Sequence, residues 1–428
     1  LRRMSTISSA SHRLTSARVL MAIAGIYISQ TIVTALATQA LPSLLRSEGA
    51  SLTVAGLTAL LWVPWGIRFL WAPWIERRRL PLGRPERRSC ALVLAGQWIM
   101  AAILAGMGLA GWMSHAPLGS FAVRLLGSLL LVALVSASTD VACDGFTVEQ
   151  LAGKWRGWGN VVQVGGSYVG AMLGAGGFLL VADKAGWPVA LVAVSLAIVL
   201  LGLPMLLLRE PPRDAALDMD HRPSLLNALR RSQVRMGLLL MLLSSIGVRL
   251  TLGMFGPFLL DKGLSLEQLG WLFGSLHIGA GLTGAMLGGL LVRAAPGWRA
   301  VWIAVSLEAL VLITLTLAAS SAPLPVLMAL VGLMLAALGF VWVALYSALM
   351  NLTSPLQAGV DFTVFQSADA LLAMAGGVAG GWLAEHLGYY FCFGLAAGLS
   401  IVAAVLVRHH ARLEQAVPSS SQGAVHVG

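Results

Sequence analysis

Long apolar segments alternate with short polar segments along the whole chain. Each apolar segment has at least the roughly 20 residues that an α-helix needs to cross the hydrocarbon of a bilayer. The pattern predicts twelve membrane helices. Their spans are about 19–45, 52–75, 90–113, 118–150, 158–182, 187–208, 236–260, 266–292, 299–320, 323–351, 359–384 and 388–408. The sequence therefore predicts an all-α polytopic membrane protein.

One connection, from Arg209 to Arg235, is long and charged, and it separates six predicted helices from six. The predicted organisation is an N-terminal tail (1–18), a first six-helix half (19–208), a linker (209–235), a second six-helix half (236–408) and a C-terminal tail (409–428).

The basic residues fall on one side of this topology. The N-terminal tail, the even-numbered loops and the C-terminal tail hold 22 of the 28 Lys and Arg residues. Basic loops stay in the cytoplasm, so both termini and the linker are predicted to be cytoplasmic. We expect a multi-pass membrane protein whose basic loops face the cytoplasm.

The composition agrees with a membrane protein. Hydrophobic residues make up 58% of the chain and charged residues 11%, against about 25% charged in a typical soluble domain. The net charge of +10 is explained by basic residues at helix ends that meet anionic lipid headgroups, so no nucleic-acid partner is expected. Cys90, Cys143 and Cys392 are isolated, and no metal site or cofactor is expected.

Charged residues inside the apolar segments are functional candidates, because an ionised side chain in the bilayer is costly unless it is paired or hydrated. Asp140 and Asp144 lie four residues apart and share one face of the fourth helix, with Glu149 nearer the surface. Arg68 on the second helix lies at a similar depth. Arg68, Asp140 and Asp144 could form a structural ion pair that locks a cytoplasmic gate, or they could bind and release a proton.

A second set of charged residues lies in the second half, near the centres of three helices. Arg249 could bind an anionic group of a substrate through its guanidinium, or it could pair with Asp369. His277 could carry a proton or could be a packing residue. Glu308 lies on a helix that we expect to be peripheral, and the sequence gives no account of it.

A third set of candidates is aromatic or carries an amide. Such side chains could line an amphipathic cavity for a flat, partly apolar ligand. Some of them could instead belong to the aromatic belts that mark the membrane surfaces, Trp62 above all. The set consists of Tyr27, Gln30, Trp62, Asn160, Gln163, Trp342 and Tyr346.

Small residues recur at helical spacing. The pentapeptide GAMLG occurs at 170–174 and again at 284–288, and Gly376 and Gly380 are also four residues apart. Such spacing lets helix backbones approach closely. We predict that these glycines lie where the two halves meet and slide. No GxxxxGK[ST], HExxH or GxSxG pattern occurs, so the chain is not expected to be an ATP-driven pump by itself or an enzyme.

Two stretches point to a family. Residues 68–77 read RFLWAPWIER and residues 140–149 read DVACDGFTVE. They resemble the muropeptide permease branch of the major facilitator superfamily, which also includes siderophore permeases of the rhizobactin and pyochelin type. Arg68 stands where muropeptide permeases carry Lys, and Glu76 stands where they carry Asp. The resemblance implies the major facilitator fold and a gating role for Glu76 and Arg77.

The resemblance also implies a secondary transporter. The resemblance also implies a bacterial inner membrane. We expect no extra pair of C-terminal helices of the kind that some muropeptide permeases have, and few polar groups could bind a sugar. Both points favour import of an iron–siderophore complex, with iron only as part of the substrate. The proton gradient would supply the energy, and an outer-membrane receptor would act upstream of a monomeric permease. The alternative cargo is a muropeptide, and a third possibility is a receptor on a transporter-like fold. Arg68, Asp140, Asp144 and Asp369 would couple or gate, and the remaining candidates would contact the substrate.

Overall fold

The computed structural model describes residues 14–41, 61–114, 118–152, 154–213, 220–264, 268, 272, 275, 277–295 and 297–416, and almost all of them are helical. Nine helices in these ranges are long and apolar enough to cross a membrane. The predicted count of twelve stays a prediction, because residues 42–60 and most of 265–276 lie outside the described ranges.

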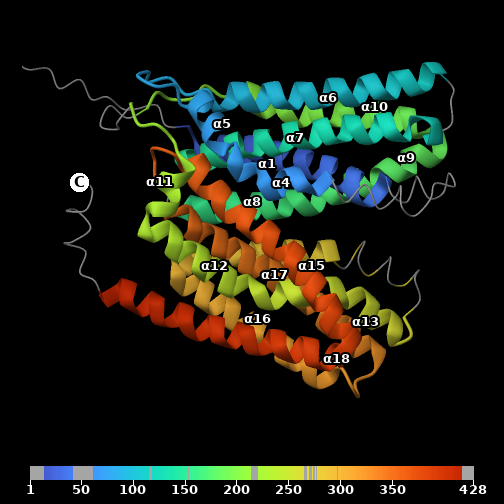
Figure 1. Cartoon of the computed structure of the whole chain (residues 1–428), viewed down its shortest axis with the longest axis vertical. Helices are drawn as coiled ribbons and strands as arrows, with labels where there is room; N and C mark the ends of the chain where they lie inside the picture. Colours follow the sequence, from blue (N-terminus) through green and yellow to red (C-terminus); the bar gives the residue numbers. More distant parts are fainter. Residues whose placement is uncertain are drawn as a thin grey trace, which may run out of the picture.

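Helices from the first part of the chain form one group. They are α1 (Ser16–Ala35) with its continuation η1 (Leu36–Ala40), α4 (Val63–Ile67), η3 (Arg68–Leu70), α5 (Ala72–Arg79), α6 (Ser89–Ser114), α7 (Leu118–Gln150), α8 (Lys154–Ala171), η4 (Met172–Gly177), α9 (Phe178–Ala185) and α10 (Trp187–Leu206). In Figure 1 this group fills the upper part of the molecule.

The second group follows the short helix α11 (Leu225–Arg230). It consists of α12 (Ser232–Thr251), η5 (Leu252–Met254), α13 (Phe255–Asp261), α15 (His277–Ala294), α16 (Trp298–Ala318), α17 (Leu324–Met350) and α18 (Ala358–Ala416). Gly388 interrupts α18 with a φ of 82°, which glycine adopts without strain, so α18 contains two predicted membrane helices.

Several helices extend beyond their predicted ends. α1 begins inside the predicted N-terminal tail, α12 begins inside the predicted linker, and α18 continues to Ala416 inside the predicted C-terminal tail. The physical reason is that hydropathy marks where the membrane ends, whereas backbone hydrogen bonding can continue through the polar headgroup region.

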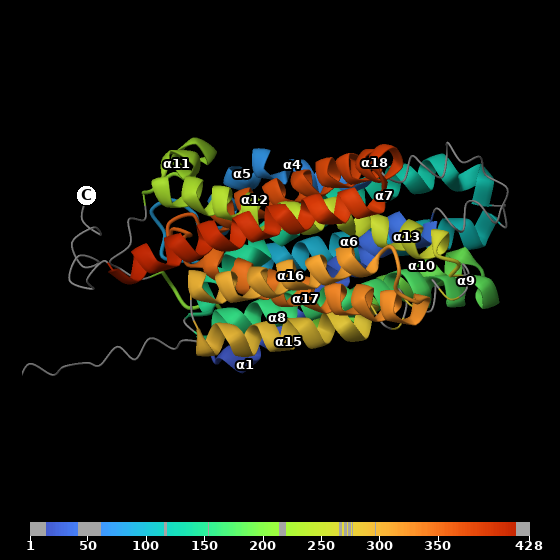
Figure 2. The same ribbon diagram turned by 90° about the horizontal axis from the view of Figure 1, so that it is seen from below.

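The two groups meet along a seam, which we define as the contacts of α4, η3, α5, α7 and α8 with α15, α17 and α18. Figure 1 shows the groups close together at the end that carries α11 and tilted apart toward the other end. Figure 2 shows the long helices running roughly parallel, with α11 and the end of α18 at the same end of the molecule.

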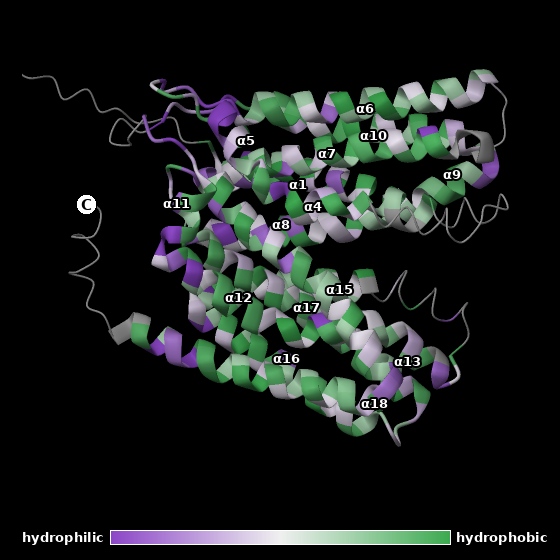
Figure 3. Ribbon diagram, viewed as in Figure 1, coloured by the Kyte–Doolittle hydropathy of each residue, from purple (hydrophilic) through white to green (hydrophobic). Residues whose placement is uncertain are grey.

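The outer surface of the helices is apolar. Leu207 is 83% exposed and Val378 is 78% exposed, and hydrophobic residues cover most of the helical ribbon in Figure 3. Polar residues gather at the end that carries α11. Such a surface is stable in lipid and would be insoluble in water.

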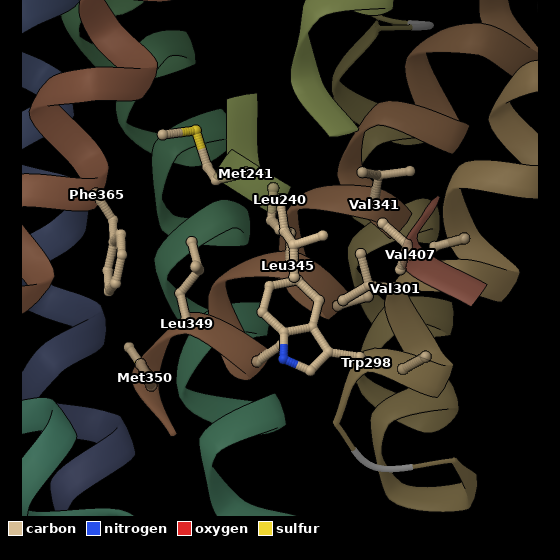
Figure 4. Close-up of a cluster of buried hydrophobic side chains, with 14 of the residues drawn as sticks. Leu240, Met241, Trp298, Val301, Val341, Leu345, Leu349, Met350, Phe365 and Val407 are labelled. Carbon is tan, nitrogen blue, oxygen red and sulfur yellow. The ribbon is translucent and has the colours of Figure 1, made fainter. Parts of the chain in front are cut away.

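Inside each group, large side chains fill the space between the helices. Figure 4 shows one such cluster, in which Leu240 from α12, Val301 from α16 and Leu345 from α17 pack together. Because lipid gives little hydrophobic drive for helix association, this close packing holds the second group together by dispersion contacts.

The predicted role of the repeated pentapeptide was wrong. A Cβ added at Gly170 would overlap the backbone of α1 at Ile28, and one added at Gly284 would overlap the backbone of α17 at Ala336. Both contacts lie inside a group rather than at the seam. Gly376 and Gly380 likewise pack on α12.

Other glycines do lie at the seam. An added Cβ at Gly289 on α15 would come within 2.4 to 3.9 Å of Val161 and Trp158 on α8, and one at Gly157 would lie 3.0 Å from Val292. Spacing alone could not separate these two kinds of glycine, because it does not say which face of a helix meets which partner.

Candidate functional site

Arg68 is the centre of a buried charged cluster in the first group. Its guanidinium forms a close ion pair with Asp140, and its Nη2 lies 4.0 Å from Asp144 Oδ2. The Arg68 side chain is 5% exposed and that of Asp144 is fully buried. The structure therefore brings together the three residues that the sequence singled out on the second and fourth helices.

Two prolines explain how Arg68 reaches this position. Pro64 and Pro73 lie in the first turns of α4 and α5, where the missing N–H costs no hydrogen bond. Pro73 has no N–H to donate to the carbonyl four residues earlier, and its ring would clash with that carbonyl, so a regular helix cannot continue through residues 69–73. The break leaves Arg68 at the start of the short 3-10 segment η3.

Asp144 has further partners from two other helices. The Tyr27 hydroxyl on α1 donates to Asp144 Oδ1 at 2.9 Å, and Gln163 Nε2 on α8 lies 3.5 Å from the same oxygen. Tyr27 also lies 3.3 Å from the Thr147 hydroxyl. Groups from α1, α7 and α8 thus meet at one carboxylate.

A matching cluster lies in the second group. Arg249 on α12 donates from Nε to Asp369 Oδ1 at 3.1 Å and from Nη2 to Asp369 Oδ2 at 2.5 Å. The Tyr346 hydroxyl donates to Asp369 Oδ2 at 2.6 Å. The guanidinium lies 5.0 Å from the ring centre of Trp342. The sequence left two possible partners for Arg249, an anionic group of a substrate or Asp369. In the structure Arg249 pairs with Asp369.

The two clusters are connected through α18. Arg68 Nη2 donates to Gln366 Oε1 across the seam, and Gln366 lies three residues before Asp369 on the same helix. Residues at this spacing are neighbours on a helix surface. Any movement of α18 relative to η3 must therefore change the surroundings of both arginines.

Gln366 was not among the candidate residues predicted from the sequence, although a similarity between two short segments points to it. Residues 160–163 read NVVQ and residues 363–366 read TVFQ. Each segment ends in a glutamine, and the two glutamines approach Asp144 and Arg68 respectively from the two sides of the seam.

A second polar network lies at the end that carries α11. Arg79 donates to Glu76 Oε1 and to Glu149 Oε1, both at 2.7 Å, and all three side chains are at most 5% exposed. Glu76 Oε1 also accepts from the Gly359 backbone N–H at 3.2 Å across the seam. Arg77 donates to the Pro223 carbonyl at 3.1 Å. The predicted gate residues Glu76 and Arg77 thus both make contacts that join distant parts of the chain.

More contacts close the same end. Asn160 on α8 donates to the Ser347 hydroxyl on α17 at 3.1 Å, and Arg156 donates to Asn351. Asn160 is buried and joins α8 to α17, and its predicted contact with a substrate stays a prediction.

The remaining candidates are dispersed. Gln30 is buried on α1, and Trp62 on the segment before α4 is 45% exposed and packs edge-on against Trp65. His277 is the first residue of α15, and its side chain lies outside the described part of the structure. Glu308 on α16 is fully buried.

Comparisons with known proteins give distant relatives. No family model matches the chain. It is 25% identical over 382 residues to an uncharacterised protein of Haemophilus influenzae, a match that spans 84% of this chain and 87% of the relative. It is also 25% identical over 276 residues to the anhydromuropeptide permease of Escherichia coli K12, a match that spans 63% of this chain and only 54% of the permease.

Solved structures of similar shape cover nearly the whole chain. A bacterial homologue of the iron transporter ferroportin, in an outward-facing state, matches 92% of this chain and 99% of its own with a TM-score of 0.64 at 16% identity. The proton:xylose symporter XylE matches 92% of this chain and 95% of its own, with a TM-score of 0.68 at 13% identity. The Escherichia coli fucose:proton symporter matches 91% of this chain and 97% of its own, with a TM-score of 0.68 at 14% identity. The chain is an all-α membrane protein with the major facilitator fold.

Proposed function

We propose that the protein is a proton-coupled secondary transporter that imports an iron–siderophore complex into the cytoplasm. The observation that carries the proposal is the pair of buried clusters, each with an arginine, an aspartate and a tyrosine, on the two sides of one seam. In this fold the halves rock around a site near the middle of the membrane. The two clusters would form such a site.

The first cluster supplies the proton site. Arg68 carries one positive charge, whereas Asp140 and Asp144 carry two negative charges when both are ionised. In a medium of low dielectric constant the excess charge is costly, and binding a proton removes it. Gain and loss of this proton would change the attraction between Arg68 and the aspartates, and hence its bond to Gln366 on α18.

The second cluster supplies the anion site. A carboxylate or phenolate of the cargo can take the place of Asp369 on the Arg249 guanidinium, since that group binds such anions through two parallel hydrogen bonds. Trp342 and Tyr346 add aromatic surface beside it. Within the described residues, Trp342 Nε1, Gln163 Oε1 and Gln30 Nε2 are buried and lack a hydrogen-bond partner. Polar groups of a cargo would satisfy them.

The closed end is consistent with the proposed direction of transport. The contacts of Glu76 with Gly359 and of Asn160 with Ser347 close the end that carries α11, which the charge pattern assigns to the cytoplasm. The groups tilt apart at the other end (Figure 1). This arrangement suits a state that receives cargo from the periplasm of a bacterial inner membrane, after passage through an outer-membrane receptor. The proposed permease acts as a monomer and needs no cofactor.

A muropeptide is the second candidate cargo. The distant relationship to the anhydromuropeptide permease favours it, and a muropeptide also carries carboxylates that could reach Arg249. The aromatic lining beside Arg249 favours the siderophore, because siderophores of the pyochelin type are flat and aromatic. The same clusters would serve either cargo.

A binding experiment separates the two cargoes. Purified protein would be titrated with ferri-pyochelin, apo-pyochelin and an anhydromuropeptide, and quenching of tryptophan fluorescence would be followed, with free tryptophan as the control for absorption by the ligand. Saturable binding of ferri-pyochelin alone is the expected result. Binding of the anhydromuropeptide alone would contradict the siderophore proposal, and binding of none would contradict both.

A further inference from the structure

Glu308 takes no part in the two clusters described above, yet it is fully buried on α16. The Ser400 hydroxyl on α18 donates to its Oε1 at 3.4 Å, and its Oε2 has no hydrogen-bond partner among the described residues. An ionised carboxylate with one long hydrogen bond is far more expensive to bury than a neutral carboxyl group.

Ser400 connects Glu308 to the Arg249 cluster. An added Cβ at Gly247 on α12 would overlap the Ser400 hydroxyl, so α12 and α18 are in close contact two residues before Arg249. Glu308 therefore lies, through Ser400, next to the part of α12 that carries Arg249. The other titratable groups around Arg249 are Asp369 on α18 and Tyr346 on α17, and neither hydrogen-bonds to Glu308 in the described structure.

Two sets of charged groups, one in each half, therefore have the same balance. The first set is Arg68 with Asp140 and Asp144, and the second is Arg249 with Asp369 and, through Ser400, Glu308. Each set has one arginine and two carboxyl groups, and hence one carboxyl group in excess.

We propose that Glu308 is a proton-binding residue of the second half, so that two protons move with each cargo molecule, one on each half. The number of protons rests on the function proposed above, whereas protonation of Glu308 does not. In the state described here the proton is on the Glu308 carboxyl group. When the closed end opens to cytoplasmic water, hydration of the site favours ionisation of Glu308. The O–H bond then breaks, and the proton passes to cytoplasmic water.

Infrared spectroscopy of the purified, ligand-free protein tests protonation without any cargo. A carbonyl band of a protonated carboxyl group at neutral pH is expected in the wild type and in Glu385→Gln, which removes an exposed carboxylate on α18. Glu308→Gln should remove the part of this band that Glu308 contributes and leave any part that comes from a proton on Asp140 or Asp144. Glu308→Asp keeps a carboxyl group, and a shifted band is expected there, which keeps the assignment testable if Glu308→Gln folds poorly. Absence of the band from the wild type, or its persistence unchanged in Glu308→Gln, would overturn the proposal.

Proton counting then tests the stoichiometry. Proteoliposomes would take up ferri-pyochelin, and alkalinisation of the medium would give protons per molecule of cargo. The expected ratio is two for the wild type and one for Glu308→Gln. An unchanged ratio in Glu308→Gln would overturn the two-proton cycle. Absence of uptake in the wild type would refute the proposed cargo, and the infrared result would still decide whether Glu308 binds a proton.

Discussion

Asp369→Asn tests the contribution of the second cluster to stability. The substitution keeps the shape of the side chain but removes the charge that pairs with Arg249. The two side chains are 11% and 4% exposed, so little water can take the place of the lost partner. Arg249 would be left as a buried and unpaired cation.

The magnitude follows from this burial. Removal of one partner of a buried ion pair costs about 3–5 kcal/mol. We expect the lower end, about 3 kcal/mol, because the amide oxygen can still accept the hydrogen bond that Tyr346 now donates to Asp369 Oδ2 at 2.6 Å. Replacement of both partners by apolar residues of similar volume is often neutral. The double variant Arg249→Met with Asp369→Leu is therefore expected within about 1 kcal/mol of the wild type.

The chain carries its own reporters for this measurement. Cys90, Cys143 and Cys392 are free and buried, so a fluorescent maleimide should label them only on unfolding. Unfolding free energies in mixed micelles would be obtained from labelling at increasing dodecyl sulfate, with Glu385→Gln as a surface control. A loss of less than about 1 kcal/mol in unfolding free energy for Asp369→Asn would refute a buried ion pair. It would also be refuted if the double variant lost as much unfolding free energy as Arg249→Met and Asp369→Leu lose in sum.

Three further predictions concern coupling, gating and packing. In proteoliposomes, Asp144→Asn should abolish uptake that is driven by a proton gradient but spare exchange of cargo between the two sides of the membrane. Loss of gradient-driven uptake together with loss of exchange would contradict a coupling role. Glu76→Gln weakens the bond to the Gly359 amide and should lengthen the distance between spin labels at the end of α5 and at the start of α18. An unchanged distance distribution would contradict a gating role. Gly284→Ala should cost about 1–3 kcal/mol by overpacking against α17, whereas Gly279→Ala meets open space and should be neutral. Equal stabilities of the two glycine variants would refute the close packing of α15.

The sequence was sufficient to predict the membrane helices, because this information is local, and the resemblance of residues 68–77 and 140–149 to a known family implied the major facilitator fold. A run of about 20 apolar residues predicts a membrane helix whatever its neighbours are. The long charged connection predicted two groups of helices, which Figure 1 shows. The ends of α12 and α18 were less accessible, because polar residues beyond the membrane continue the helix without changing its hydrogen bonding.

The candidate residues were harder to place, since their roles depend on partners from distant segments. The rule that buried charges are functional found Arg68, Asp144 and Asp369, because any charge in lipid stands out. It did not find Gln366, which is uncharged and gains its role only from the approach of Arg68 across the seam. It also gave no account of Glu308, whose neighbour Ser400 lies 92 residues away.

Gradient-driven flux tests the central claim most directly. Proteoliposomes with an alkaline interior would be given labelled ferri-pyochelin or a labelled anhydromuropeptide, and uptake would be compared with that of vesicles without protein and with that of vesicles in which an ionophore has collapsed the gradient. The account predicts accumulation of ferri-pyochelin above its external concentration, only with protein and only while the gradient lasts. Accumulation that is unchanged when the gradient collapses, or no uptake of either compound, would contradict proton-coupled transport by this protein.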